Sequence, residues 1–406
     1  MGAFLPELQE VMETKNKHEI WELRQMQALP LEAKVTMTKH RIQSWVDEFG
    51  IDGVYVSFSG GKDSTVLLHI ARQLYPNMKA VFVDVPTQFP ELKEFVLTFD
   101  NVDILKPKIS FAQVCEKYGF PMISKEVSNC VDGARKYLKY LDRKKNKQQN
   151  LNRQTVPNAC YMADLRVIDR RIDKRNVDYQ NLQKGIIPCG SKYRLNRLNG
   201  TLTDGNGSKS RFNHERYKFF LDADFEISDR CFDAMKKKPV RDYERRTGRR
   251  PIIATMAVES AIRTQKWLQD GCNAFAAIRP HSNPMSFWTE QDVLIYIKEK
   301  NLPICSVYGE IVTDYEAMGQ CENQMTFSDY GIFGEERQLL KTTGCARTGC
   351  VLCGFGCHLE KESRFLRLKE THPKFHNLLY VLKNNGVTYA EAIDWINEHG
   401  NMKIKY

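Results

Sequence analysis

The chain has 406 residues, of which 42% are hydrophobic and 27% charged, so it can bury a full core and form two or three structural units. No apolar stretch is long enough to cross a bilayer, and the N-terminal sequence lacks a signal-peptide core, which excludes a membrane protein and predicts a cytoplasmic one. The net charge of +10 favours polyanionic partners such as nucleotides or nucleic acid.

Helices and buried strands alternate through the first part of the chain. Apolar spacing predicts a helix over 34–49, a strand over 53–58, a helix from Ser64 to Tyr75 and a strand over 79–84. Further strands are predicted at 102–105, 251–254 and 273–278. This alternation predicts an α/β fold in which helices cover both faces of a parallel twisted sheet.

The middle of the chain breaks this pattern. Residues 135–175 are rich in Arg and Lys and contain Tyr137, Tyr140 and Tyr161, and 199–211 is rich in turn residues. We expect an inserted basic helical subdomain, which could bind a nucleic-acid backbone, contact a protein partner or simply be solvated. Helical patterns return at 289–299 and 388–398. The predicted organisation is an N-terminal helical extension (1–33), an α/β domain (34–129 with 226–343), the basic insertion (130–225), and a cysteine-cluster segment with a C-terminal helical cap (344–406).

A polar loop lies where the first predicted strand meets its helix. At such a junction backbone N–H groups and the helix dipole favour a bound anion, and paired glycines let the main chain approach it closely. Lys62 adds positive charge, and Asp63 could hold Lys62 or help to bind a divalent cation. The glycine spacing and Asp63 depart from the Walker A pattern. The loop residues predicted to bind phosphate are Ser57, Ser59, Gly60, Gly61, Lys62, Asp63, Ser64 and Thr65, with Lys62 and Asp63 as catalytic candidates.

The segment Ser59 to Ser64, SGGKDS, is identical to the signature of the PP-loop superfamily of adenine nucleotide alpha hydrolases, and the chain most resembles the phosphoadenosine phosphosulfate (PAPS) reductase family within it. The resemblance implies ATP with Mg²⁺, or a related adenine nucleotide, as ligand. It also implies that Asp84 lies near the adenosine and that Arg263 and Lys266 are anion contacts. It extends to segments 83–91, 227–231, 236–239, 255–260, 284–293 and 302–303.

Four of the twelve cysteines lie between Cys345 and Cys357, and a Cys350-x-x-Cys353 spacing is typical of zinc and iron–sulfur ligation. Cluster-bearing sulfonucleotide reductases resemble this pattern with an added upstream Cys-Cys pair, of which Cys231 matches the first and Phe232 replaces the second. Two ligand sets follow: Cys231, Cys350 and Cys353 with Cys345 or Cys357, or the four local residues alone. We expect a [4Fe–4S] cluster, with structural zinc as the alternative. The scattered cysteines 115, 130, 160, 189, 272, 305 and 321 are predicted mostly to be buried small apolar residues.

Three functions fit these features. The first is an ATP pyrophosphatase that adenylylates a substrate, for which nucleic acid is the favoured class, before iron–sulfur-dependent sulfur transfer. DNA phosphorothioation ATPases and tRNA thiolation enzymes resemble this combination of loop and cysteines. The second is a PAPS or adenylyl-sulfate reductase, although the C-terminal Glu-Cys-Gly-hydrophobic-His tail of that family is missing here. The third is a nucleotide-binding regulatory protein without turnover. A sulfur-donor or regulatory protein partner is compatible with the first and third.

Overall fold

The computed structural model describes residues 16–151, 189–317 and 339–406. The chain divides into two compact units, each built from two separate stretches. The first unit comprises Met1–Lys108 and Lys236–Cys350, and the second comprises Ile109–Met235 and Val351–Tyr406. The domain boundaries expected from the sequence stay predictions beside this division. No helix among the described residues is both long enough and apolar enough to span a membrane.

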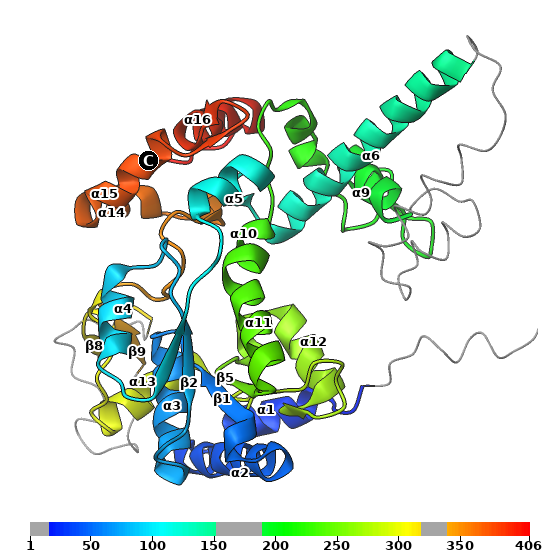
Figure 1. Ribbon diagram of the computed structural model, residues 1–406. Coiled ribbons are helices and arrows are strands. Elements are labelled where there is room, and N and C mark those ends of the chain that lie inside the picture. The colour runs from blue at the N-terminus through cyan, green and yellow to red at the C-terminus, as the bar shows by residue number, and fades with distance from the viewer. Residues whose placement is uncertain (1–15, 152–188, 318–338) are drawn as a thin grey trace, which may run out of the picture. The chain divides into compact units, whose positions relative to one another are not determined.

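A six-stranded sheet in the order β3-β2-β1-β5-β7-β6 forms the centre of the first unit (Figure 1). Strands β1 (Val54–Ser57), β2 (Ala80–Val83), β3 (Val102–Leu105) and β5 (Arg250–Ile253) are parallel to one another, and β7 (His281–Ser282) is parallel to β5. The edge strand β6 (Asn273–Ala274) is antiparallel to β7. This mostly parallel sheet confirms the predicted fold class. The strand predicted over 273–278 is shorter than expected.

Helices cover both faces of this sheet, as predicted. Val54 and Val56 of β1 point into the main core with Trp45 of α2 (Leu31–Phe49) and Leu67 of α3 (Lys62–Leu74). Tyr55, between them, points the other way and packs with Tyr243 of α11 (Lys238–Thr247). Alternate residues of a strand face opposite sides, so one strand contacts both helical layers. The other described elements of this unit are α1 (Ile20–Ala28), α4 (Pro90–Leu97), α12 (Ala261–Asp270), α13 (Glu290–Glu299), the short helices Ile51–Gly53, Ala257–Glu259 and Ser306–Tyr308, and the antiparallel pair of β8 (Ile311–Thr313) and β9 (Leu340–Thr342).

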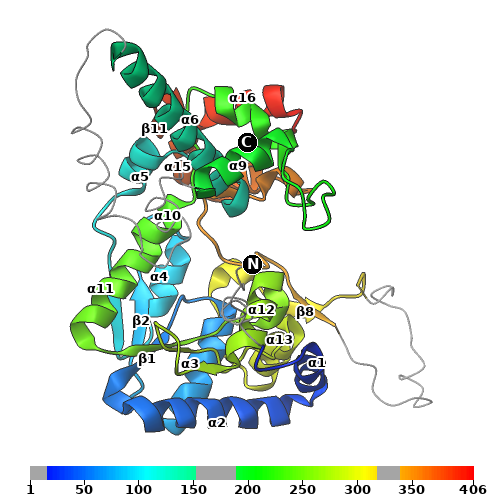
Figure 2. The same ribbon diagram turned by 90° about the vertical axis from the view of Figure 1, so that its right-hand side faces the viewer.

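The second unit is mainly helical. Its long helix α6 (Lys125–Leu151) packs against α9 (Cys189–Asn199), as Figure 2 shows. Short strands β4 (Met122–Ile123) and β10 (Gly354–Phe355) pair in parallel, and β11 (Lys383–Asn384) forms a hairpin with β12 (Val387–Thr388). The C-terminal helix α16 (Tyr389–Gly400) confirms the helical pattern at 388–398 and begins with a capping box of Thr388 and Glu391. Its other helices are α5 (Phe111–Tyr118), Glu215–Asp222, α10 (Arg230–Phe232), Cys357–Leu359, α14 (Arg364–Thr371), α15 (Pro373–His376) and Asn377–Tyr380.

The basic stretch predicted as an insertion is described only in part. Tyr137 is buried and stacks on Tyr140, whose side chain is exposed, while Tyr161 lies outside the described residues. Lys136 pairs with Asp132, and Lys139 pairs with Glu226. Part of the positive charge and one of the tyrosines considered for nucleic-acid binding are therefore engaged within the protein.

Candidate nucleotide-binding site

The predicted phosphate loop lies at the carboxyl end of β1, and α3 begins directly after it at Lys62. Gly60 has a φ of +72°, and a Cβ on it would lie 2.9 Å from Cγ2 of Val96, so this position requires glycine. The Ser64 hydroxyl accepts the Ser59 backbone N–H at 3.1 Å and donates to the Gly61 carbonyl at 2.9 Å. These bonds hold the turn between β1 and the N-terminus of α3, where the first backbone N–H groups have no partner within the helix.

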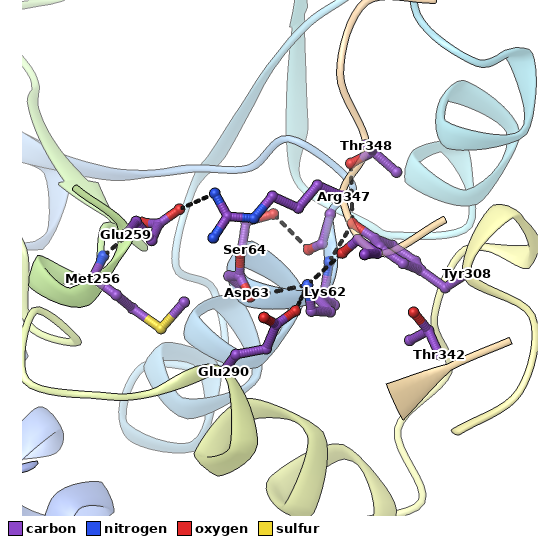
Figure 3. Close-up of polar contacts among 12 residues, drawn as sticks. Lys62, Asp63, Ser64, Met256, Glu259, Glu290, Tyr308, Thr342, Arg347 and Thr348 are labelled. Atoms are coloured by element: carbon purple, nitrogen blue, oxygen red, sulfur yellow. Dashed lines mark hydrogen bonds and ion pairs between the residues drawn. The ribbon is translucent and has the colours of Figure 1, made fainter. Parts of the chain in front are cut away.

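Lys62 is the centre of a polar cluster built from distant parts of the first unit (Figure 3). Its side chain is only 3% exposed, and its Nζ lies 2.8 Å from the Ala346 carbonyl oxygen and 3.0 Å from the Glu290 carboxylate. Its backbone N–H donates to the Tyr308 hydroxyl at 3.2 Å. A positive charge and a helix N-terminus are thus presented at one place, which suits an anion.

Asp63 lies beside Lys62, with its Oδ1 atom 4.0 Å from Nζ of Lys62. Burial raises the pKa of the Asp63 carboxyl, and the negative charge of Glu290 raises it further, against the lowering effect of Lys62. Oδ1 is buried and has no hydrogen-bond partner among the described residues. An orphaned carboxylate oxygen near a second carboxylate fits Mg²⁺, which is held by one or two carboxylates together with substrate phosphates.

Two arginines share the Glu259 carboxylate next to this cluster. Arg347 lies 3.6 Å from it, and Arg263 forms an ion pair with its other oxygen. Burial lowers the pKa of Arg263, and the charge of Arg347 lowers it further. Arg263 was predicted as an anion contact, and it also lines a small cavity with Lys266, Trp267 and His281.

The predicted adenosine contact Asp84 follows β2 and pairs with Lys93 of α4 at 2.9 Å. Its role in binding stays a prediction. Ser57 ends β1, and the Thr65 hydroxyl donates to the Gly61 carbonyl at 3.1 Å, so this hydroxyl helps to hold the loop.

Sequence reasoning missed Glu290, Tyr308, Arg347 and Thr348. Glu290 lies within segment 284–293, which resembles the family, but no motif marks it as a site residue. Arg347 and Thr348 lie between cysteines whose spacing predicts only a metal site. The Tyr308 hydroxyl is 3.0 Å from Oγ1 of Thr348, and burial raises its pKa to about 12, so it stays protonated at neutral pH. Only the folded chain brings these side chains to the loop.

The five predicted metal ligands are divided between the units. Cys345 and Cys350 belong to the first unit, and Cys231, Cys353 and Cys357 belong to the second. Within the described residues, no group of three or more His, Cys, Asp or Glu side chains is arranged to hold a metal ion. Both ligand sets expected from the sequence draw on both units, and they stay predictions.

Four thiols of the second unit act electrostatically on one buried tyrosine, Tyr389. The Tyr389 hydroxyl donates to the Leu352 carbonyl at 2.9 Å. Burial raises the pKa of Tyr389 well above its usual value, and thiolate charge at Cys353, Cys357, Cys115 and Cys231 raises it further. Cys115 is fully buried on α5, which packs against α10, the helix that carries Cys231. Cys231 therefore lies on a helix that packs beside Cys115, a cysteine that the sequence assigned to the core.

Comparisons with known proteins support the assignment of the loop. A family model for the phosphoadenosine phosphosulfate reductase domain matches residues 53–144, which include the loop and α3. A protein of Caenorhabditis briggsae named "Probable FAD synthase" is 35% identical over 75 residues, which cover 16% of this chain and 14% of that protein. The chain thus matches only a small part of that relative's length. Together with the mostly parallel sheet, these similarities confirm the predicted family resemblance and support nucleotide binding by the loop.

Proposed function

We propose, from the premise that this chain carries a domain of the PAPS reductase-like family, that it is an ATP pyrophosphatase that adenylylates a substrate for iron–sulfur-dependent sulfur transfer. The observation that carries the proposal is the buried ammonium group of Lys62 at the N-terminus of α3, beside the orphaned oxygen of Asp63. The ammonium group and the helix N-terminus suit the negatively charged polyphosphate of a nucleotide, and the Asp63 oxygen suits the cation that accompanies it. Nucleic acid is the substrate class we favour, because of the net charge of +10.

In this reaction a nucleophilic oxygen of the substrate attacks the α-phosphorus of ATP, and the bond from that phosphorus to the bridging oxygen breaks. Substrate adenylate forms and pyrophosphate leaves. Lys62 and the N-terminus of α3 stabilise the negative charge that develops on the departing oxygens. Asp63 and Glu290 would hold Mg²⁺, which neutralises the polyphosphate when it is bound.

The loop assignment is tested by Lys62→Ala and Asp63→Ala. Each variant should lose ATP-dependent pyrophosphate release by at least about 100-fold, the range seen when one preorganised donor is removed. Thermal melts should show that both variants remain folded. Lys79→Ala is the matched control. Lys79 lies in the same unit, and its Nζ pairs with Oδ1 of Asp103 at a distance of 3.2 Å rather than with any residue of the loop cluster. Unchanged ATP affinity and turnover in both loop variants would contradict the proposal, whereas ATP binding by wild type without any turnover would favour the regulatory alternative.

The cofactor part of the proposal concerns the thiols of the second unit. A [4Fe–4S] cluster takes four cysteine thiolates, and the second unit holds the predicted ligands Cys231, Cys353 and Cys357, whose charges act on Tyr389 together with that of Cys115. Bound by these thiols, it would supply or carry the sulfur that displaces AMP from the adenylylated substrate. Zinc is the alternative metal.

Anaerobic purification followed by iron, acid-labile sulfide and zinc analysis tests this cofactor. Cys353→Ser and Cys357→Ser should each lower the iron and sulfide content severalfold, and Cys115→Ser should do the same if this residue is the fourth ligand. Cys130→Ser is the control, since Cys130 is buried in the same unit and its thiol donates to the Arg194 carbonyl. Stoichiometric zinc without sulfide would remove the iron–sulfur proposal.

One observation favours a PAPS or adenylyl-sulfate reductase as the second candidate. Cys345 immediately precedes Ala346, whose carbonyl contacts Lys62, so a thiol lies on the chain segment at the loop. In that reaction the thiolate attacks the sulfur of the sulfonucleotide, an S-sulfocysteine forms, and the nucleotide phosphate leaves. A thioredoxin-dependent release of sulfite that disappears in Cys345→Ser would favour this candidate over the first.

A further inference from the structure

A short segment of the first unit lies against the phosphate loop and supplies a hydrogen-bond acceptor to Lys62. This segment, Cys345–Gly349, is here called the strap. Its Ala346 carbonyl oxygen accepts a hydrogen bond from Nζ of Lys62 at 2.8 Å. A Cβ placed on Gly61 would lie 3.3 Å from the Thr348 hydroxyl and 3.1 Å from the Tyr308 hydroxyl. The space beside Gly61 is therefore lined by hydroxyl oxygens of the protein.

These oxygens also use the donors that a phosphate would use. The Tyr308 hydroxyl accepts the Lys62 backbone N–H at 3.2 Å, and it shares a 3.0 Å hydrogen bond with Thr348, as Figure 3 shows. Apart from the carboxylates of Glu290 and Asp63, the acceptors around Lys62 are neutral oxygens: the Ala346 carbonyl and the Tyr308 hydroxyl, whose pKa burial raises to about 12. Hydrogen bonds to an ionised acceptor are about twice as strong as neutral ones, so a polyphosphate would replace these oxygens favourably.

The two ends of the strap are held differently. At its start, the Cys345 N–H donates to the Val307 carbonyl at 2.8 Å, and the preceding Gly344 N–H donates to the Tyr308 carbonyl at 2.8 Å. At its other end, a Cβ on Gly349 would meet nothing within 4 Å. The strap is thus anchored beside Tyr308 and loosely surrounded where it ends.

The strap also carries a positive charge next to the loop. Arg347 is 61% exposed, and it pairs at 3.6 Å with Glu259, a carboxylate already paired with Arg263. The charges of Arg347 and Arg263 both act on Asp63. Two guanidinium groups that share one carboxylate have charge left to bind a second anion.

We propose that the strap and Tyr308 close the phosphate loop in the absence of ligand, and that a nucleotide polyphosphate displaces their oxygens from Lys62 while Arg347 binds the polyphosphate. The strap is then both a competitor for the loop and the source of one ligand-binding residue. This inference rests on the proposed nucleotide function and adds to it a means of regulating the same site.

The test is calorimetric titration of the full-length chain with ATP and Mg²⁺. Tyr308→Phe removes one competing oxygen and should tighten ATP binding about fivefold, the equivalent of one net hydrogen bond. Arg347→Gln should weaken binding at least about tenfold, the worth of a charged hydrogen bond. Tyr296→Phe is the matched control and should bind ATP as wild type does, because Tyr296 is buried in the same unit and its hydroxyl bonds to His69.

The outcomes separate this inference from the proposed function. If wild type binds ATP and Tyr308→Phe binds it equally or more weakly, the displacement is wrong while the proposed function stands. Unchanged affinity in Arg347→Gln removes the ligand role of Arg347. If neither wild type nor Tyr308→Phe binds ATP, the proposed function fails and the strap fails with it. ATP binding that appears only in Tyr308→Phe would support the strap.

Discussion

Two buried lysines of the first unit show how burial can serve structure or a site. The Lys34 ammonium lies 2.7 Å from Asp292, and both side chains are almost completely buried. Asp292 also accepts the backbone N–H of Thr289 at the start of α13. Lys34 is thus committed to one carboxylate in the core, whereas Lys62 lies among a carbonyl oxygen and two carboxylates at a helix N-terminus.

Lys34→Met should therefore destabilise the chain without any role for nucleotide. Removing one partner leaves an uncompensated buried charge, which costs about 3–5 kcal/mol of unfolding free energy. Chemical denaturation followed by tryptophan fluorescence measures the loss, with Lys79→Met as the surface control. A loss below about 1 kcal/mol, the size typical of exposed pairs, would show that the pair contributes little.

At the scale of single residues, the loop could be predicted because its residues are consecutive in the sequence and together form a phosphate-binding motif. Lys62, Asp63 and Ser64 needed only the sequence and the junction of strand and helix. Glu290, Tyr308 and Arg347 come from separate segments that meet the loop only through the fold. No periodicity or local motif marks a residue whose partner is far along the chain.

Among the elements, β10 of the second unit depends on the absence of a side chain. A Cβ on Gly354 would lie 2.5 Å from the sulfur of Met122 and 2.7 Å from the Pro121 carbonyl oxygen. Those atoms belong to the segment that pairs with β10, so any larger residue must push β10 away from β4. The position is also directly beside Tyr389, whose hydroxyl would lie 2.9 Å from that Cβ.

Gly354→Ala should lower stability by about 1–3 kcal/mol, as overpacking does in tight cores. The same substitution at Gly205, where a Cβ would meet nothing within 4 Å, is the control in the same unit. Equilibrium unfolding in urea measures both variants. Equal midpoints for the two would mean that β10 accommodates the methyl group.

The sequence predicted long elements better than short ones. α2 and α13 appeared within a few residues of their predicted bounds, because amphipathic periodicity reports which face is buried. The strand predicted over 273–278 contains only β6, and Phe275 and Ile278 just after it are exposed. Apolar residues alone do not indicate whether a neighbouring strand is available to pair with them.

For the molecule as a whole, four partly or fully buried histidines contribute to the response to acid. Burial lowers the pKa values of His69, His214, His358 and His376. The unfolded chain then takes up protons at these sites below about pH 6.5, before the folded chain does. Folding stability from these groups is therefore intact above that pH and falls as the pH decreases towards the lowered values.

Thermal melts should show a falling midpoint between about pH 6.5 and pH 5, and little change from these groups between pH 7 and 8. His376→Phe should make the acid slope shallower, because His376 is only 2% exposed and its Nε2 has no hydrogen-bond partner among the described residues. His399, which is partly exposed on α16, provides the control for the same substitution. An acid slope that is identical in wild type and His376→Phe would exclude this site as a contributor.

At the same scale, the sequence predicted the α/β class because strand and helix signals alternate over adjacent residues. It did not predict that residues 109–129 and 351–406 would form one unit, since such grouping depends on contacts between distant segments. Pairing of β4 with β10, for example, joins Met122 to Gly354.

The interleaving of the two units has a practical consequence for dissecting the protein. The backbone crosses from one unit to the other after Lys108, after Met235 and after Cys350. No simple truncation can therefore yield either half intact, and a minimal nucleotide-binding fragment would need a gene in which the codon for Lys108 is spliced, through a designed linker, to that for Lys236. Trimming from the N-terminus first removes part of the first unit, trimming from the C-terminus first removes part of the second, and neither isolates a whole unit.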